Sequence, residues 1–231
     1  MTDLWTCHLG SVEYREAAAL QERLRARVIA GELPALLLLL EHPAVYTLGR
    51  RSDPADLPFG PDFWRARGID VVQTPRGGRL TYHAPGQLVG YPIMHAGDIP
   101  TYIRTMEQAL VAALAEEGIE ARGRDHEGPR YTGVWVEDRK IASIGVHLSK
   151  GVTAHGFAVN VDNDVAPFHQ VTACGLPDVR MTSIALETGR TGGLPCFRKR
   201  VAYAYARAHG LRQRIVHPAR LLDAARAPVP A

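Results

Sequence analysis

Two segments of the sequence carry most of the side chains that could do chemistry. Residues 76–87 read RGGRLTYHAPGQ, and residues 133–182 contain both Lys140 and Cys174 among several histidines. A thiol becomes a strong nucleophile when a base or a cation lies beside it, and it can then carry an acyl group as a thioester. A cysteine and a lysine within one segment could act as a nucleophile and its base, provided that the fold brings the two side chains together.

Lysine is rare in this chain. Of the 27 basic residues only three are lysine, at positions 140, 150 and 199, and the rest are arginine. Read as a strand, Lys140 shares one face with Ala142, Ile144 and Val146, whereas Ile141, Ser143 and Gly145 occupy the other face. Burial disfavours the charged form of a lysine, whereas arginine keeps its proton at any workable pH. Residue types alone leave two interpretations of Lys140 open: a base on an apolar face, or a lysine at a strand end that reaches into water.

The cysteines differ in their surroundings. Cys174 lies in the loop TACGLP, where Gly175 leaves space beside the sulfur, and Cys196 follows Pro195 at a predicted helix start. A helix N-terminus favours the thiolate, and so do neighbouring cations. Cys7 lies within a predicted strand and is expected to be a small buried apolar residue. Residue types alone leave Cys174 and Cys196 both open as the nucleophile.

The segment 76–87 has the features of a ligand-binding loop. Gly77 and Gly78 let the backbone approach a ligand closely, and Tyr82 and His83 offer hydrogen-bond donors and an acceptor. The alternative is a hairpin with polar side chains. The chain has no phosphate-loop, dinucleotide, GxSxG or HExxH pattern, and its ten histidines show no ligand spacing. We expect neither a metal nor a cofactor.

Composition predicts an ordinary globular protein. The net charge of +3 does not indicate a nucleic-acid partner, and the longest apolar run, residues 35–40, is too short to span a membrane. The first residues lack the pattern of a secretory signal, and three cysteines without CxxC spacing make a disulfide framework unexpected. We expect a protein of the cytoplasm with a free thiol.

Periodicity predicts a mixture of helices and strands. Strands are expected at residues 4–9, 35–41, 69–73 and 86–93, followed by a meander formed by TGVWVE, KIASIGVHL and VTAHGFAVNV. Helices are expected from a cap at Ser11 to about residue 31, at 100–117 and at 197–209. This pattern favours an α/β (α+β) fold with a mixed, largely antiparallel sheet flanked by helices. We expect a single domain at residues 1–218 and a flexible tail at residues 219–231.

Five stretches, in this order, resemble the lipoyl(octanoyl) transferase family, often called LipB. They are EHPAVYTLG at residue 41, RGGRLTYHAPGQLVGYP at 76, GVWVEDRKIASIG at 133, HGFAVNV at 155 and ACGLPDVRMTS at 173. The resemblance covers roughly residues 35–185. It implies the catalytic-domain fold shared by biotin and lipoate protein ligases.

The resemblance also implies roles for individual residues. Cys174 would carry the acyl group and Lys140 would move protons, whereas Cys196 has no counterpart role in the family. The substrate site would be lined by Arg76, Gly77, Gly78, Arg79, Leu80, Thr81, Tyr82, His83, Ser143, Ile144, Gly145, Gly156, Phe157 and Ala158.

The implied reaction moves an octanoyl or lipoyl group from acyl carrier protein to a lysine of a lipoyl domain. The acceptors would be the lipoyl domains of 2-oxoacid dehydrogenase complexes and the H protein of glycine cleavage. The enzyme would work as a monomer, without ATP. Two alternatives remain at this stage: an ATP-dependent lipoate or biotin ligase, and a non-catalytic protein that binds acyl carrier or lipoyl domains.

The sequence departs from the family pattern at Ala84, where the family usually has glycine in YHGPGQ. Because a residue before proline is restricted to extended conformations, which alanine tolerates, we expect a negative φ at Ala84.

Overall fold

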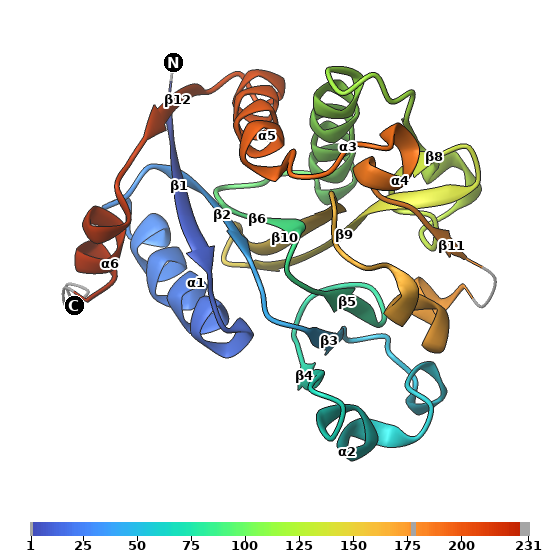
Figure 1. The fold of residues 1–231 in the computed structure, drawn as a ribbon. Coiled ribbons are helices and arrows are strands. Elements are labelled where there is room, and N and C mark those ends of the chain that lie inside the picture. The colour runs from blue at the N-terminus through green and yellow to red at the C-terminus, as the bar shows by residue number, and fades with distance from the viewer. Residues whose placement is uncertain (1, 177–178, 227–231) are drawn as a thin grey trace.

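The computed structural model describes residues 2–176 and 179–226, which form two β-sheets and the helices around them (Figure 1). The strands are β1 (Asp3–Ser11), β2 (Ala35–Glu41), β3 (Val45–Leu48), β4 (Asp70–Gln73), β5 (Thr81–His83), β6 (Gln87–Ile93), β7 (Arg122–Gly123), β8 (Gly133–Val136), β9 (Arg139–Ser149), β10 (Val152–Asn160), β11 (Arg180–Met181) and β12 (Arg212–Ile215). The helices are α1 (Tyr14–Ile29), α2 (Gly60–Arg65), α3 (Ile99–Ala115), α4 (Ile184–Thr188), α5 (Leu194–Ala208) and α6 (Pro218–Arg226).

The larger sheet has the order β12-β1-β2-β6-β10-β9-β8-β7, and β11 pairs with β9 outside this path. Strands β12, β1 and β2 run parallel to one another, and every neighbouring pair from β2 to β7 is antiparallel. The smaller sheet has the order β4-β3-β5. The predicted fold class, a mixed and largely antiparallel sheet flanked by helices, is confirmed.

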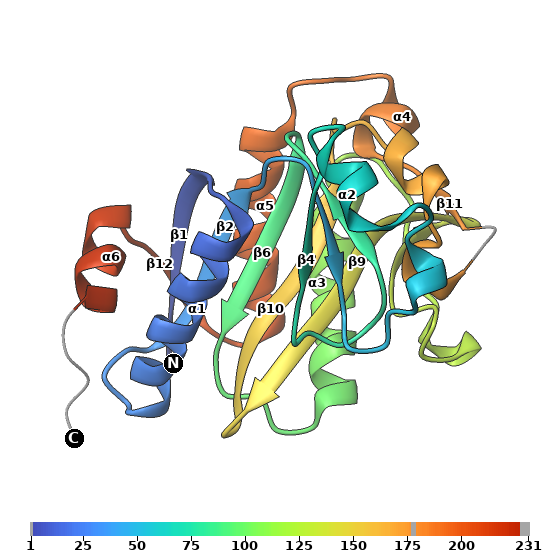
Figure 2. The same ribbon diagram turned by 90° about the horizontal axis from the view of Figure 1, so that it is seen from below.

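Helices cover both faces of the larger sheet: α1 and α6 pack on one face, and α3 and α5 on the other (Figures 1 and 2). Strand β2 has an unbroken apolar sequence because it is buried on both faces. Leu36, Leu38 and Leu40 belong to the core under α1, whereas Leu37 and Leu39 belong to the core under α3 and α5.

The first helix starts later than the sequence predicts. Ser11 is the last residue of β1, where it pairs with Glu41 of β2, and this pairing continues the strand past the expected cap. The carboxylate of Glu13 caps α1 instead and accepts the backbone N–H groups of Arg15 and Glu16. The prediction of a Ser11 cap is wrong because strand pairing takes precedence over a local capping preference.

The C-terminal region also differs from its prediction. Helix α6 lies where a flexible tail from residue 219 was expected, and its Leu221 and Ala225 are buried in the core under α1. These two residues lie four positions apart and therefore share one helical face. The rest of the predicted tail, residues 227–231, lies outside the described residues.

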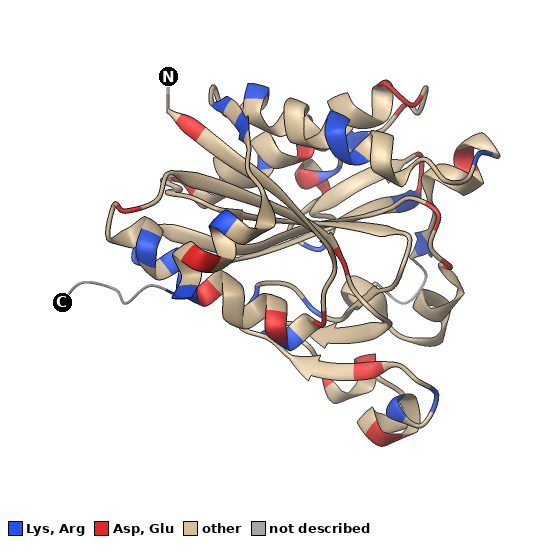
Figure 3. Ribbon diagram, turned by 60° about the vertical axis from the view of Figure 1, so that its left-hand side comes forward, with Lys and Arg blue, Asp and Glu red and all other residues tan. Residues whose placement is uncertain are grey.

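Charged side chains lie mainly on the helices and loops, while the central strands carry few of them (Figure 3). Strands β2, β6 and β10 together contain one such residue, Glu41. Lys140, on the neighbouring strand β9, is therefore a charged residue in a part of the sheet that contains few of them. Among the residues that the structure describes, no helix has the length and apolarity needed to cross a membrane.

Candidate active site

A cavity of about 40 Å³ lies where β9 and β10 of the larger sheet face the segment that leads into β5 of the smaller sheet. Twelve of the residues predicted for the site line it: Arg76, Arg79, Leu80, Thr81, His83, Ser143, Ile144, Gly145, Gly156, Phe157, Ala158 and Cys174. The side chains of Tyr14, Tyr91 and His155 complete the lining, and sequence analysis did not identify them. Of the other predicted residues, Gly77, Gly78, Tyr82 and Lys140 lie outside the lining.

The thiol of Cys174 is held at one end of this cavity. Its sulfur lies 3.3 Å from Nζ of Lys140 and 4.0 Å from Oγ of Ser143. The backbone of Cys174 is left-handed, with φ 59° and ψ 9°, and its N–H donates to the carbonyl of Leu80 at 3.0 Å. A left-handed conformation is costly for a residue with a side chain and persists when the surroundings enforce it. The conformation of the loop therefore determines the position of the sulfur.

An ion pair supports the cysteine loop; it joins Arg79, in the loop before β5, to Asp56, in the segment between β3 and α2. Arg79 donates two hydrogen bonds to the carboxylate of Asp56, at 2.9 and 2.7 Å, and Asp56 is 1% exposed. Gly175 has φ 69°, and a Cβ placed on it would lie 2.4 Å from Cδ of Arg79. The N–H of Thr172 also donates to the carbonyl of Asp56. Glycine at 175 thus permits the close packing that joins Cys174 to this ion pair.

Lys140 is almost completely buried, with 2% of its surface exposed. Its ammonium donates to the carbonyl of Thr132 at 2.9 Å and to the sulfur of Cys174, and it lies 5.2 Å from the ring centroid of Trp135. A buried ammonium needs such partners because leaving it unpaired would be costly. The alternative interpretation, a lysine at a strand end that reaches into water, is therefore wrong for Lys140.

The predicted face of Lys140 is wrong because a β-bulge interrupts the strand. Val134 pairs with Ala142, whereas the next residue, Trp135, pairs with Lys140, so that Ile141 is an extra residue on β9. An extra residue reverses the alternation of side chains beyond it. Lys140 therefore shares the side of Ser143, next to the cysteine, and does not share the face of Ala142.

A buried carboxylate lies behind the lysine. Glu107 of α3 is 4% exposed, and it accepts the N–H of Gly133 at 2.7 Å. Burial raises the pKa of Glu107, and the N–H of Gly133 and the charge of Lys140 act in the opposite direction. Gly133 also packs on the lysine, since a Cβ there would lie 2.7 Å from Cε of Lys140. Sequence analysis missed Glu107 because it lies within an ordinary amphipathic helix.

The loop before β5 is organised by Arg76. Its guanidinium donates to the carbonyl and the hydroxyl of Thr47, at 2.6 and 2.8 Å, and to the carbonyl of Gly77 at 3.0 Å. Desolvation lowers the pKa of Arg76. Gly77 donates its N–H to the carbonyl of Val146 on β9, and Gly78 has φ 83°. The two glycines thus shape the loop without lining the cavity.

Alternation along β5 separates the tyrosine from the site. Thr81 and His83 face the cavity, whereas Tyr82 points the other way and packs against Tyr46 and Phe168 in the core of the smaller sheet. The expectation that Tyr82 supplies hydrogen-bonding groups to the site is corrected accordingly. Nδ1 of His83 lies 2.7 Å from Oε1 of Gln87, and burial holds the pKa of His83 well below its usual range.

The end of the cavity away from Cys174 is formed by rings. The hydroxyl of Tyr14 lies 3.5 Å from Nδ1 of His155, and Tyr14 stacks on His83 with ring centroids 5.9 Å apart. His42 bridges the hydroxyl of Tyr91 and the carbonyl of Val12, at 2.7 and 2.6 Å. Burial lowers the pKa of His42 to about 4 and that of His155 to about 3. These histidines are therefore neutral hydrogen-bonding groups near pH 7.

Three further expectations can be compared with the structure. Ala84 does not have a positive φ, which confirms the prediction, and its side chain is buried in the core of the smaller sheet. Cys7 is 1% exposed, and burial raises the pKa of its thiol to about 11, as befits a core residue. Cys196 is exposed in the first turn of α5, away from the cavity. Within residues 2–176 and 179–226, no group of three or more His, Cys, Asp or Glu side chains is placed to hold a metal ion.

Comparisons with known proteins identify the family. The model of the lipoyl protein ligase A/B catalytic domain matches residues 13–206. An octanoyltransferase of Mycobacterium ulcerans is 44% identical over 212 residues, which cover 87% of this chain and 86% of the relative. The chain belongs to the lipoyl(octanoyl) transferase family. Another member, from Geobacter sulfurreducens, is 47% identical over 189 residues and covers 79% of this chain and 74% of its own length. As a member of this family, the chain is an acyltransferase.

Solved structures agree on the fold. The putative lipoate protein ligase Ta0514 of Thermoplasma acidophilum, with bound lipoic acid, superposes with a TM-score of 0.76 at 18% identity, covering 97% of this chain and 93% of that one. A biotin protein ligase of Aquifex aeolicus reaches a TM-score of 0.53 at 13% identity, covering 90% and 69% of the two chains. The lipoate and biotin ligase-like fold implied by the sequence is thus confirmed.

Proposed function

We propose that this acyltransferase moves an octanoyl group from acyl carrier protein to a lysine of a lipoyl domain, through a thioester on Cys174. The observation that carries the proposal is the distance of 3.3 Å between the sulfur of Cys174 and Nζ of a buried Lys140. The names of the relatives, octanoyltransferases at 44–47% identity, support the choice of acyl group. The acceptors are the lipoyl domains of 2-oxoacid dehydrogenase complexes and the H protein of glycine cleavage.

In the first half-reaction, the thiolate of Cys174 attacks the carbonyl carbon of the donor thioester. The ammonium of Lys140 stabilises this thiolate before the attack. A new C–S bond to Cys174 forms, the C–S bond to the carrier breaks, and the leaving sulfur takes a proton from Lys140. The lysine is then neutral and ready to act as a base.

In the second half-reaction, the amine of the acceptor lysine attacks the thioester on Cys174. A C–N bond forms, the C–S bond breaks, and the neutral amine of Lys140 accepts the proton that the attacking nitrogen loses. Cys174 leaves as a thiolate beside a lysine ammonium, which restores the starting pair. Arginine at position 140 would supply the charge but would not give up a proton, so that this cycle requires lysine.

Each half-reaction passes through a tetrahedral oxyanion, which enzymes stabilise with fixed hydrogen-bond donors. The N–H of Cys174 already donates to the carbonyl of Leu80. We therefore assign oxyanion stabilisation to the backbone around Gly175, which the packing of Arg79 holds in place.

The acyl chain enters the apolar part of the cavity, between Ile144, Phe157 and the side-chain-free backbone of Gly145 and Gly156. A cavity that accepts benzene has a volume of about 150 Å³, whereas this one has about 40 Å³. The lining side chains must therefore move apart when the chain enters. Since a buried methylene contributes about 0.8 kcal/mol, a chain two carbons shorter is expected to bind roughly fifteen-fold more weakly. Every protein group used lies in one chain, which suits a monomer.

The experiment is a transfer assay with two donors. Octanoyl-acyl carrier protein without ATP, or octanoate with Mg-ATP, is incubated with the enzyme and an apo lipoyl domain, and the mass of the lipoyl domain is recorded. We expect octanoylation from the carrier alone. Octanoylation that needs octanoate and Mg-ATP would make the chain a ligase, and binding of either protein without any product would make it a non-catalytic adaptor.

A further inference from the structure

Tyr14 and His155 separate the cavity from a second, larger space. A groove of about 340 Å³ runs between α1 and the segment of the smaller sheet at residues 72–75, and the same two side chains line both hollows. The groove wall is mostly apolar and includes Ala18 and Pro75. Tyr14 and His155 are 3% and 4% exposed, so that they fill the space between the two hollows.

The register of the sheet gives the distance from the thiol to this partition. Ser143 lies 4.0 Å from the sulfur of Cys174, and three residues further along β9 Val146 pairs with His155. Three residues of a strand span about 10 Å. An extended chain advances about 1.2 Å per covalent bond, so that the seven C–C bonds of an octanoyl group span about 8 Å. A chain laid along β9 from Cys174 therefore ends at Tyr14 and His155.

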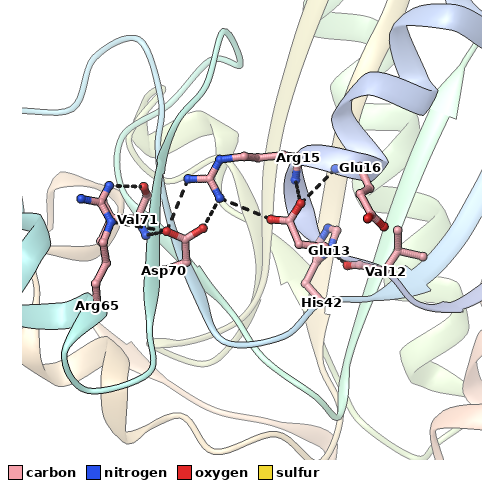
Figure 4. A network of polar contacts seen from close by, with 8 residues as sticks. All are labelled: Val12, Glu13, Arg15, Glu16, His42, Arg65, Asp70 and Val71. Atoms are coloured by element: carbon pink, nitrogen blue, oxygen red, sulfur yellow. Dashed lines mark hydrogen bonds and ion pairs between the residues drawn. The ribbon is translucent and has the colours of Figure 1, made fainter.

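Hydrogen bonds and an ion pair fix the positions of Tyr14 and His155. The hydroxyl of Tyr14 lies 3.5 Å from Nδ1 of His155, and the N–H of His155 donates to Oε1 of Gln21 at 2.7 Å. His155 has φ 58° in the middle of β10, a left-handed conformation that is costly for a residue with a side chain and persists where the surroundings enforce it. Next to Tyr14, Arg15 pairs with Asp70 of β4 and so holds α1 against the smaller sheet (Figure 4).

We propose that Tyr14 and His155 form the end wall of the acyl site and set its chain length at about eight carbons. Acyl groups longer than this need the pair to part, because the space for further carbons lies in the groove behind it. This inference rests on the proposed function, since it takes the acyl chain to start on Cys174. It assigns a specificity-determining role to Tyr14, which lies outside the five stretches of the family resemblance, and to His155, the first residue of the HGFAVNV stretch.

Two variants open the wall in different ways. His155→Gly removes the ring and suits the positive φ at this position, because glycine adopts it without strain. Tyr14→Ala shortens the other half of the wall on a helix that tolerates alanine. Ala18→Phe is the matched variant, since Ala18 lies one helical turn after Tyr14 and faces the groove but not the cavity.

The experiment measures the initial rate of acyl-enzyme formation by intact mass, with carrier proteins bearing six-, eight-, ten- and twelve-carbon chains. We expect the wild type to favour eight carbons over twelve, and either opening variant to raise the twelve-to-eight ratio of rates by ten-fold or more. Adding Ala18→Phe to an opening variant should cancel this gain, whereas Ala18→Phe alone should leave the wild-type ratio in place.

Two results would contradict the inference, and they differ from each other. If His155→Gly and Tyr14→Ala both form the octanoyl-enzyme but keep the wild-type ratio, the wall lies elsewhere while the proposed function stands. If the wild type forms no acyl-enzyme with any donor, the proposed function fails and the chain-length inference fails with it.

Discussion

The two ends of the cavity are built from different chemistry. At the reactive end, a half-buried thiol lies 3.3 Å from a buried ammonium, and a bidentate ion pair between Arg79 and Asp56 braces the loop. At the closed end, Tyr14, His42 and His155 form a cluster of rings, and burial holds the pKa values of the two histidines at about 4 and about 3. The reactive end therefore contains groups that could exchange a proton. The closed end contains neutral side chains that define the shape of the cavity.

Because of this difference, we expect the two ends to control different properties: the rate of transfer and the selectivity for acyl-chain length. In the proposed mechanism, proton transfer and thiolate stabilisation depend on Lys140 and Cys174, so that changes there should act on the rate for every acyl chain. Changes at the ring cluster should act on chain length and on stability.

Replacing Lys140 should almost abolish transfer, whether the new residue is alanine or arginine. General base catalysis contributes about 10²- to 10⁴-fold, and arginine cannot accept the proton of the incoming amine. The measurement is the steady-state rate of lipoyl-domain octanoylation. Lys150→Arg is the control, because Lys150 is exposed in a turn, and it should keep the wild-type rate. Near-normal turnover by Lys140→Arg would show that the lysine supplies charge alone.

Glu107→Gln should slow transfer by about ten-fold. Glutamine can still accept the N–H of Gly133, but hydrogen bonds to a charged acceptor are roughly twice as strong as neutral ones. The change therefore loosens the backbone at residues 132–133. The ammonium of Lys140 donates a hydrogen bond to the carbonyl of Thr132 in this segment. The rate is measured with eight- and six-carbon donors, and the loss should be equal for both. A loss confined to one chain length would assign Glu107 to the shape of the cavity instead.

The buried histidines near the closed end should make the protein less stable in acid. His42, His83 and His155 have pKa values lowered by burial, so that below about pH 6.5 the unfolded chain binds protons that the folded chain does not. The free energy of unfolding should then fall by about 1.4 kcal/mol per pH unit for each such histidine, until the folded pKa is reached. Urea unfolding at pH 7, 6 and 5 measures this slope, and His42→Gln should make it shallower. A free energy of unfolding that stayed constant over this range would contradict the neutral cluster.

Much of the fold follows from local sequence patterns. The apolar run of β2, the meander of β8 to β10 and the negative φ of Ala84 were all predictable, because alternation, burial on two faces and the proline restriction act within a few residues. The start of α1 was not, since pairing of Ser11 with β2 depends on a distant strand. Helix α6 was missed because its small apolar face gains its stability from contact with the core under α1.

The reactive end was partly predictable and the closed end was not. Cys174 and Lys140 were singled out by residue type and by resemblance, but the bulge at Ile141 that brings the lysine to the thiol leaves no trace in the sequence. Tyr14, Glu107 and His155 lie in segments with ordinary amphipathic or strand patterns. Their roles arise only where α1, α3 and β10 pack against the site.

The decisive measurement for a thioester on Cys174 is the intact mass of the protein after mixing with octanoyl-acyl carrier protein in the absence of ATP. We predict one added octanoyl group on the wild type and on Cys196→Ser, none on Cys174→Ser, and loss of the group when apo lipoyl domain is added. An adduct that survives in Cys174→Ser, or one that apo lipoyl domain does not discharge, would contradict a thioester on Cys174 as the intermediate of transfer.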